Sequence, residues 1–256
     1  MAVRDLSHVE LYTRDKVATV RFLVSTMGFT RVADSVAVDR SSGLLRQGDV
    51  QIVVTSGWAT GRWRAEHGDG IADVALTCDD VSETARAALA AGATVTYSPQ
   101  GVPVVSGWGP VSHTLLPAAT AGPAVAPAGH TWIDSPQTPE GPRGRAHHIG
   151  HIGIRLTVAD LAEYAAFCTA ALDLSRLPAL PSPCPAHGGA DTASVVLGGG
   201  SQRVTLALTA AQAAPSGPTP PPAGEVPFTT LQFGALTSLC LEPAERGSLH
   251  ALSAAG

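Results

Sequence analysis

The chain has 256 residues, of which 45% are hydrophobic and 14% charged, and its formal net charge is −5. This length and a mean hydropathy of +0.17 are typical of a globular protein with one large or two ordinary domains. The 16 Lys and Arg residues are scattered and form no basic face, which argues against nucleic acid as a partner.

The sequence also argues against membrane insertion and secretion. Its amino terminus lacks the apolar core of a signal peptide, and no stretch approaches the ~20 apolar residues that span a bilayer. The cysteines lie far apart without a Cys-x-x-Cys pair, which favours reduced thiols over a disulfide framework. We therefore expect a cytoplasmic protein that has no membrane partner.

The first element is a strand over residues 7–13, because polar and apolar side chains alternate there. Residues 16–27 carry apolar side chains at helical spacing, and Gly28 ends the predicted helix. Strand patterns follow, separated by Asp, Ser and Gly, at residues 31–38, 43–47 and 50–55. These elements form one βαβββ unit.

The same unit recurs along the chain. A second copy starts with a strand at 70–77 and a helix at 81–91, and three further strands are predicted at 94–98, 102–105 and 111–116. A third copy has a strand at 147–156, a helix at 160–172, and strands at 193–197 and 202–208. A fourth begins within 228–241 and is predicted to continue as a helix at 244–254, without closing strands.

Composition separates the halves. Residues 117–145 are rich in Pro, Ala and Gly, as in an extended connector, and residues 213–227 form a second Pro-rich stretch. We expect a complete first barrel at 1–118, a connector at 119–146 and a reduced second half at 147–256.

Histidines gather at the start of the third unit. His147, His148 and His151 lie within five residues, and a strand with a period of two places His147 and His151 on one face. His151 aligns with His8, which opens the first unit. His151 is therefore the first candidate for a metal ligand.

Four βαβββ units that carry a His on the first strand of the first and third units resemble the vicinal-oxygen-chelate superfamily. Within it, His8-Val-Glu-Leu-Tyr, His67-Gly-Asp-Gly and Ser112-His-Thr-Leu are similar to the 4-hydroxyphenylpyruvate dioxygenase and hydroxymandelate synthase families. The resemblance is good over about residues 6–113, fair over 149–174 and weak beyond. It implies an α+β fold of tandem βαβββ modules, with the last module incomplete.

The resemblance also implies an Fe(II) site in the second half, built from two His and one Glu. His151 occupies the first ligand position; Thr230 or Thr237 stands at the second, depending on the alignment of the Pro-rich loop. The third would lie on a strand that the predicted elements do not include. Thr205 and Ala207 stand at the family's substrate-facing positions. Non-haem Fe(II) requires two imidazoles and a carboxylate, so Fe(II) is the expected cofactor if this triad is completed, and none if it is lost.

The first half holds a second combination of metal-ligating residue types. His8 and Asp73 open the first two units, and His113 lies on the strand that closes that half. The alternative interpretation is a structural hydrogen-bond network.

These patterns leave three functions open. The first is a dioxygenase-like oxidation of a small aromatic or 2-oxo-acid molecule. The second is a metal-free tailoring enzyme that works by positioning its substrate for cyclisation or isomerisation, and the third is a protein that sequesters a small molecule. An unpaired sheet edge in the incomplete fourth unit predicts a homodimer or a covering Pro-rich segment.

Overall fold

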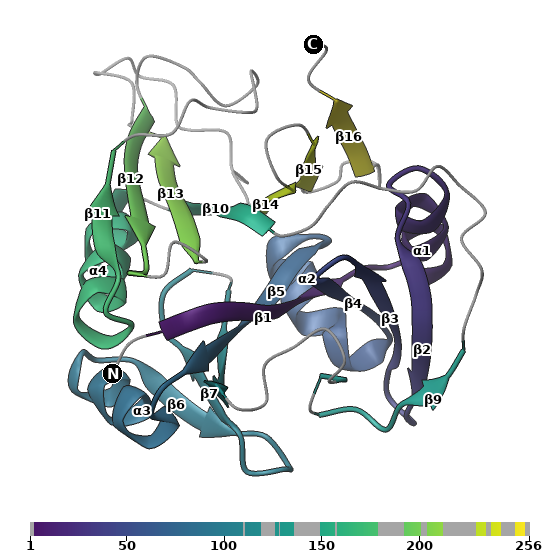
Figure 1. The fold of residues 1–256 in the computed structure, drawn as a ribbon, viewed down its shortest axis with the longest axis horizontal. Coiled ribbons are helices and arrows are strands. Elements are labelled where there is room, and N and C mark those ends of the chain that lie inside the picture. Colours follow the sequence, from purple (N-terminus) through teal and green to yellow (C-terminus); the bar gives the residue numbers. More distant parts are fainter. Residues whose placement is uncertain are drawn as a thin grey trace.

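The computed structural model describes residues 3–109, 111–118, 126–127, 129–135, 149–156, 158–178, 192–200, 204–211, 229–233, 237–241 and 249–253. Nine strands form one sheet and seven form a second, with few helices packed against them (Figure 1). The predicted α+β class with βαβββ modules is confirmed. Among the described residues, no helix combines the length and apolar character needed to cross a membrane.

The first module follows the predicted order. Its elements are β1 (Val3–Tyr12), α1 (Lys16–Ser25), β2 (Thr30–Val36), β3 (Ser41–Gln47) and β4 (Val50–Ser56). Helix α1 begins where the carboxylate of Asp15 accepts a hydrogen bond from the backbone N–H of Ala18 at 2.9 Å, an N-cap. Strand β4 returns parallel to β1 and pairs with it directly.

The second module repeats this arrangement beside the first. It comprises β5 (Gly70–Cys78), α3 (Val81–Ala90), β6 (Thr94–Tyr97), β7 (Pro103–Ser106) and β8 (His113–Pro117). Strand β5 runs antiparallel to β1, and β8 runs parallel to β5 as β4 does to β1. The first sheet therefore has the order β6-β7-β8-β5-β1-β4-β3-β2, to which a short strand, β9 (Ile133–Asp134), is added at β2.

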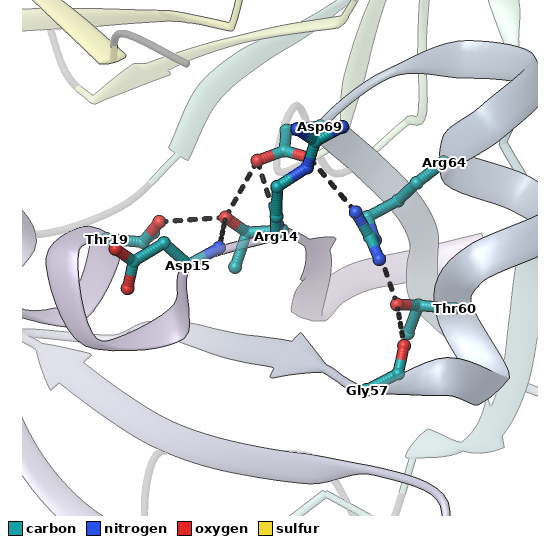
Figure 2. Close-up of polar contacts among 8 residues, drawn as sticks. Arg14, Asp15, Thr19, Gly57, Thr60, Arg64 and Asp69 are labelled. Atoms are coloured by element: carbon teal, nitrogen blue, oxygen red, sulfur yellow. Dashed lines mark hydrogen bonds and ion pairs between the residues drawn. The ribbon is translucent and has the colours of Figure 1, made fainter.

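Two short helices that the sequence did not predict connect the modules: η1 (Trp58–Thr60) and α2 (Gly61–His67). Figure 2 shows how Asp69, directly after α2, holds them in place. Its carboxylate accepts hydrogen bonds from the hydroxyl of Thr13 and the backbone N–H of Arg14, both at 2.9 Å, and lies 3.9 Å from the Arg64 guanidinium. Arg64 in turn donates to Thr60 at 3.0 Å. The Asp of the His67-Gly-Asp-Gly motif thus joins the end of β1 to α2.

The second half begins as a copy of the first. Its elements are β10 (Ile149–Leu156), α4 (Val158–Ala171), β11 (Ser175–Leu177), β12 (Thr192–Gly198) and β13 (Thr205–Ala211), followed by β14 (Thr229–Phe233), β15 (Thr237–Leu241) and β16 (Leu249–Ser253). Strand β10 pairs in parallel with β13 and antiparallel with β14, as β1 does with β4 and β5.

The fourth module departs from the pattern and corrects two expectations. Residues 249–253, within the predicted helix 244–254, form β16, because all five pair with β15 and this pairing outweighs the helix propensity of Leu and Ala. The unpaired edge predicted for the strand near residues 228–239 is also wrong, because β14 pairs with β10 on one side and β15 on the other. Among the described strands, β16 forms the edge of the second sheet (Figure 1).

One hydrophobic core joins the two halves. It contains side chains of the first sheet, such as Leu76 and Leu115, together with Tyr164 and Phe167 of α4. The backbone N–H of Val3 also donates to the carbonyl of Leu172, at 3.4 Å. The opposite face of the first sheet carries a separate, smaller apolar cluster, described below.

Candidate functional sites in the two sheets

A straight row of side chains crosses the first sheet on the face away from the main core. Asp73 on β5 lies opposite Glu10 on β1, Glu10 opposite Val53 on β4, Val53 opposite Leu44 on β3, and Leu44 opposite Ala33 on β2. Directly opposite residues point to the same side of a sheet. The row is therefore acidic at one end and apolar at the other.

Asp73 is buried and Glu10 is partly buried, and both carboxyls accept hydrogen bonds. Thr55 donates to Glu10, and Ser112 donates to Asp73, each at 2.6 Å. Burial raises the pKa of Asp73 to about 7, and the neighbouring charge of Glu10 adds to this rise, while hydrogen bonds from Ser112 and Thr114 oppose it. Burial also raises the pKa of Glu10, against the effects of the Thr55 hydrogen bond and the charge of Arg40. Two adjoining carboxyls with raised pKa values can hold a proton near neutral pH.

Residues 129–135, which are part of the predicted connector, lie over this row, and we call them the strap. Strand β9 pairs with β2, where Asp134 lies opposite Ala33, and the backbone N–H of Ser135 donates to the carbonyl of Val32 at 3.0 Å. At the other end, Arg40 donates to the carbonyl of Gly129 at 3.3 Å. The strap is therefore fixed to the first sheet at both ends.

Two aromatic side chains of the strap contact the row, one at Glu10 and one at the apolar residues. Trp132 packs on the apolar cluster of Ala33, Leu44 and Val53, and its indole N–H donates to the carbonyl of Pro127 at 2.7 Å. The imidazole of His130, 7% exposed, has its Nε2 3.8 Å from a carboxylate oxygen of Glu10. The two rings lie 4.7 Å apart between centroids. Burial and the nearby Arg40 lower the pKa of His130 to about 4, so its ring is neutral at pH 7.

The structure separates the three residues of the alternative metal site in the first half. His8 and Asp73 belong to the strands of the row, and His8 is buried, with its pKa lowered to about 3 by desolvation and by His130. His113 lies on the other face of the sheet, where its Nε2 hydrogen-bonds the hydroxyl of Tyr164 on α4. Burial lowers the pKa of His113 to about 4. His113 therefore does not join His8 and Asp73 in one site, because neighbouring Ser112 faces Asp73 and the next residue points away.

In the second half, the predicted site residues meet on strands around β10. Gly153 on β10 lies opposite Ala207 on β13 and Thr230 on β14, and Thr230 lies opposite Cys240 on β15. This row continues to His250 on β16, opposite Cys240. Across the sheet, Ala207, Gly153, Thr230, Cys240 and His250 thus lie in one line on β13, β10, β14, β15 and β16.

The other predicted residues take neighbouring register positions. His151, two residues from Gly153 along β10, lies opposite Gln232 on β14. Thr205 begins β13 opposite Gly198, whereas Thr237 begins β15 opposite Phe233 and so lies one strand further from β10 than Thr230 does. Of the two Thr residues considered for the second ligand position, Thr230 is the one on the strand that neighbours His151.

The described residues do not by themselves fit an Fe(II) ion. Within the described part of the chain, no three His, Cys, Asp or Glu side chains gather closely enough to hold a metal. Strands β10, β13 and β14 carry His151 but neither Asp nor Glu. His147 and His148, the other histidines of the sequence cluster, lie outside the described residues.

Sequence reasoning missed the strap. It treated residues 119–146 as an extended connector, although His130 and Trp132 contact the buried row. The available signal was the presence of two large aromatic side chains in a segment otherwise composed mainly of small residues and Pro. Glu10 was likewise overlooked, although it shares a strand face with His8.

Comparisons with known proteins agree with this architecture. Residues 7–108 match the family described as the Glyoxalase/Bleomycin resistance protein/Dioxygenase superfamily. A 4-hydroxyphenylpyruvate dioxygenase of Yarrowia lipolytica is 26% identical over 134 residues, which cover 44% of this chain and 34% of that protein.

Solved structures extend the likeness into the second half. A mutant of 4-hydroxymandelate synthase from Streptomyces coelicolor has 28% sequence identity and a TM-score of 0.68, covering 82% of this chain and 63% of that one. A fusion of a xylose isomerase-like TIM barrel with 4-hydroxyphenylpyruvate dioxygenase shares the fold at 19% identity, with a TM-score of 0.64, over 83% of this chain and 33% of that one. The chain thus spans about a third of the curated dioxygenase's length.

The paired βαβββ modules and the family match define the class of the first half: residues 7–108 form a domain of the glyoxalase/bleomycin resistance protein/dioxygenase superfamily, the vicinal-oxygen-chelate proteins. Within it, its homologues are 4-hydroxyphenylpyruvate dioxygenase and hydroxymandelate synthase.

Proposed function

We propose that this protein carries out a dioxygenase-like oxidation of a small aromatic 2-oxo acid on the face of the second sheet that includes His151. The observation that carries the proposal is the position of His151 on β10, between β13 and β14, in a module that repeats the first strand for strand. The 28% identity to 4-hydroxymandelate synthase across 82% of this chain supports the same reaction class.

The residues around His151 suit a ligand of this size. Gly153 has no side chain and Ala207 beside it has only a methyl group, and a glycine within a strand often marks close approach of a ligand. Thr230 on the other side of Gly153 brings a hydroxyl group that can donate to or accept from a carboxylate or oxo group. These residues would bind and orient the substrate; we assign them no part in the chemistry.

The proposed cofactor is Fe(II), for which His151 would supply one imidazole. If iron were held there, it would supply the redox chemistry that oxidation of a 2-oxo acid by dioxygen requires. Because the described residues do not complete a set of ligands, we derive no step through the metal. Fe(II) dependence is therefore the first property to measure.

The decisive experiment is an anaerobic Fe(II) titration of the full chain. We expect about one ion bound per chain, loss of binding in His151→Ala, and unchanged binding in His67→Ala, a histidine of α2 in the first half. Wild-type protein should then consume oxygen when given 4-hydroxyphenylpyruvate. Absence of iron uptake by the wild type at neutral pH would exclude the dioxygenase function.

A metal-free function is the second candidate, and the composition of the strands favours it. The sequences of β10, β13 and β14 contain residues with hydroxyl and amide groups, such as Thr205, Thr230 and Gln232, and no carboxylates. Such a surface can bind and position a small molecule without a metal. Mass spectrometry of the recovered ligand separates the two versions: an altered mass or retention time identifies a tailoring enzyme, and an unchanged ligand that raises the melting temperature identifies a binding protein.

A further inference from the structure

The strap fills a surface that has the composition of a ligand site. Small-molecule sites combine apolar walls with a few polar groups that fix the orientation of the ligand. The row under the strap has this form, because Ala33, Leu44 and Val53 make an apolar floor next to the partly buried carboxyl of Glu10. The strap places one aromatic ring over each part: the Trp132 indole on the floor, and the His130 imidazole beside Glu10.

The strap is also attached in a way that allows a ligand to displace it. Apart from the contacts of Trp132 and His130, the described residues attach it to β2 through a two-residue strand and one further backbone hydrogen bond, and to Arg40 through a bond to the Gly129 carbonyl. A strand of two residues at a sheet edge has little intrinsic stability. Ile133, which belongs to this two-residue strand, is 66% exposed and contributes little apolar burial.

We propose that this face of the first sheet is a binding site for a small planar aromatic molecule with a neutral hydrogen-bonding group, and that the strap occupies it as a tethered competitor. Trp132 and His130 take the place of the aromatic ring and the hydrogen-bonding group of that ligand. A tethered occupant competes at an effective concentration in the millimolar range, so a free ligand binds weakly until the strap is loosened. This site is separate from the one proposed around His151 and belongs to the other sheet.

The test uses indole as the probe and loosens the strap without altering the surface beneath it. Ser135→Pro removes the N–H that bonds the Val32 carbonyl, and Ser135→Ala is the matched control that retains it. We expect the dissociation constant for indole to be about tenfold lower in Ser135→Pro than in Ser135→Ala. At ten times that constant, indole should raise the melting temperature of the proline variant by about 3–5 °C. Equal binding by the two variants would overturn the proposal.

Two further variants keep the test informative if the proline variant is unstable. Trp132→Ala vacates the apolar part of the surface and should also bind indole, whereas Trp58→Ala, which removes a tryptophan that is 75% exposed, should bind no more than the wild type. If Ser135→Pro is folded and only Trp132→Ala binds indole more tightly than the wild type, indole fills a void created by the truncation. That result would contradict the proposal.

Hydrogen exchange reports displacement directly. Indole bound in Ser135→Pro should speed amide exchange in residues 129–135, because the strap is released, and slower exchange there would contradict the proposal. His151→Ala should leave indole binding unchanged, so that failure of this inference and failure of the proposed function can be told apart.

Discussion

Glu10 and Asp73 lie opposite each other on the antiparallel strands β1 and β5, and burial raises the pKa of both carboxyls. A carboxyl with a raised pKa binds its proton more tightly in the folded than in the unfolded chain. Its contribution to folding is therefore most favourable at low pH and is lost as the pH rises from the unfolded value towards the folded one. For Asp73 this window runs from 3.8 to about 7.

We predict that Asp73→Asn makes the protein more stable, relative to the wild type, as the pH rises across this window. The difference should grow by up to about 4 kcal/mol, because about three pKa units of burial penalty disappear. The buried histidines His8, His113 and His130 have lowered pKa values and destabilise the fold below pH 6.5, but they act in both proteins and cancel in the difference.

Urea unfolding at several pH values measures this effect. The control is Asp79→Asn, which removes an exposed carboxyl whose pKa is lowered by Arg4 and which should leave the slope between pH 4 and 7 unchanged. Parallel stability curves for wild type and Asp73→Asn would show that the carboxyl of Asp73 is not desolvated.

Tyr164→Phe should destabilise the protein by about 1–3 kcal/mol, because it leaves Nε2 of buried His113 without its partner. The free energy of unfolding gives the value directly. Tyr97→Phe is the matched control: Tyr97 is 65% exposed, and we expect a change near zero. Equal effects of the two substitutions would mean that the His113 hydrogen bond makes no net contribution to the free energy of unfolding.

Asp69→Ala should lower the free energy of unfolding by about 1–3 kcal/mol, since it removes an acceptor shared by the Thr13 hydroxyl and the Arg14 backbone N–H (Figure 2). Asp49→Ala, at an exposed position in the turn between β3 and β4, should have little effect. Thermal denaturation of the two variants distinguishes them, and a stable Asp69→Ala would assign the His67-Gly-Asp-Gly motif a role other than fastening α2.

The edge strand of the second sheet predicts self-association. Strand β16 has a neighbour on one side only among the described strands, and an uncovered edge offers backbone groups for pairing with another copy. We expect a homodimer, whose mass light scattering on dilute protein would measure. A monomer at all concentrations would contradict this and indicate that the edge is covered within the chain.

The sequence predicted regular, periodic elements well and tertiary contacts poorly. Alternation and helical spacing identified the strands and helices of the first two modules and those of the third except β11, because each element buries one face against a shared core. The sequence failed at residues 249–253, where Leu and Ala favour a helix but pairing with β15 makes a strand.

The candidate sites show the same limit. Residue types alone grouped His8, Asp73 and His113, but a phase difference of one residue along β8 turns His113 towards Tyr164. The contact of His130 with Glu10 joins residues 120 positions apart, and no local pattern encodes such a pairing. Register across the second sheet likewise required the structure: it was the pairing of Thr230 with Gly153 that placed Thr230 beside β10.

The continuous core beneath α4 has a consequence for how this protein can be divided. Tyr164 and Phe167 pack with side chains of the first sheet, and Trp108 of the first half lies 4.4 Å from Phe167 between ring centroids. A fragment ending at the connector would therefore expose the apolar surface that α4 covers in the full chain. The two halves repeat the same strand order, but because they share this core we expect them to unfold together in one transition.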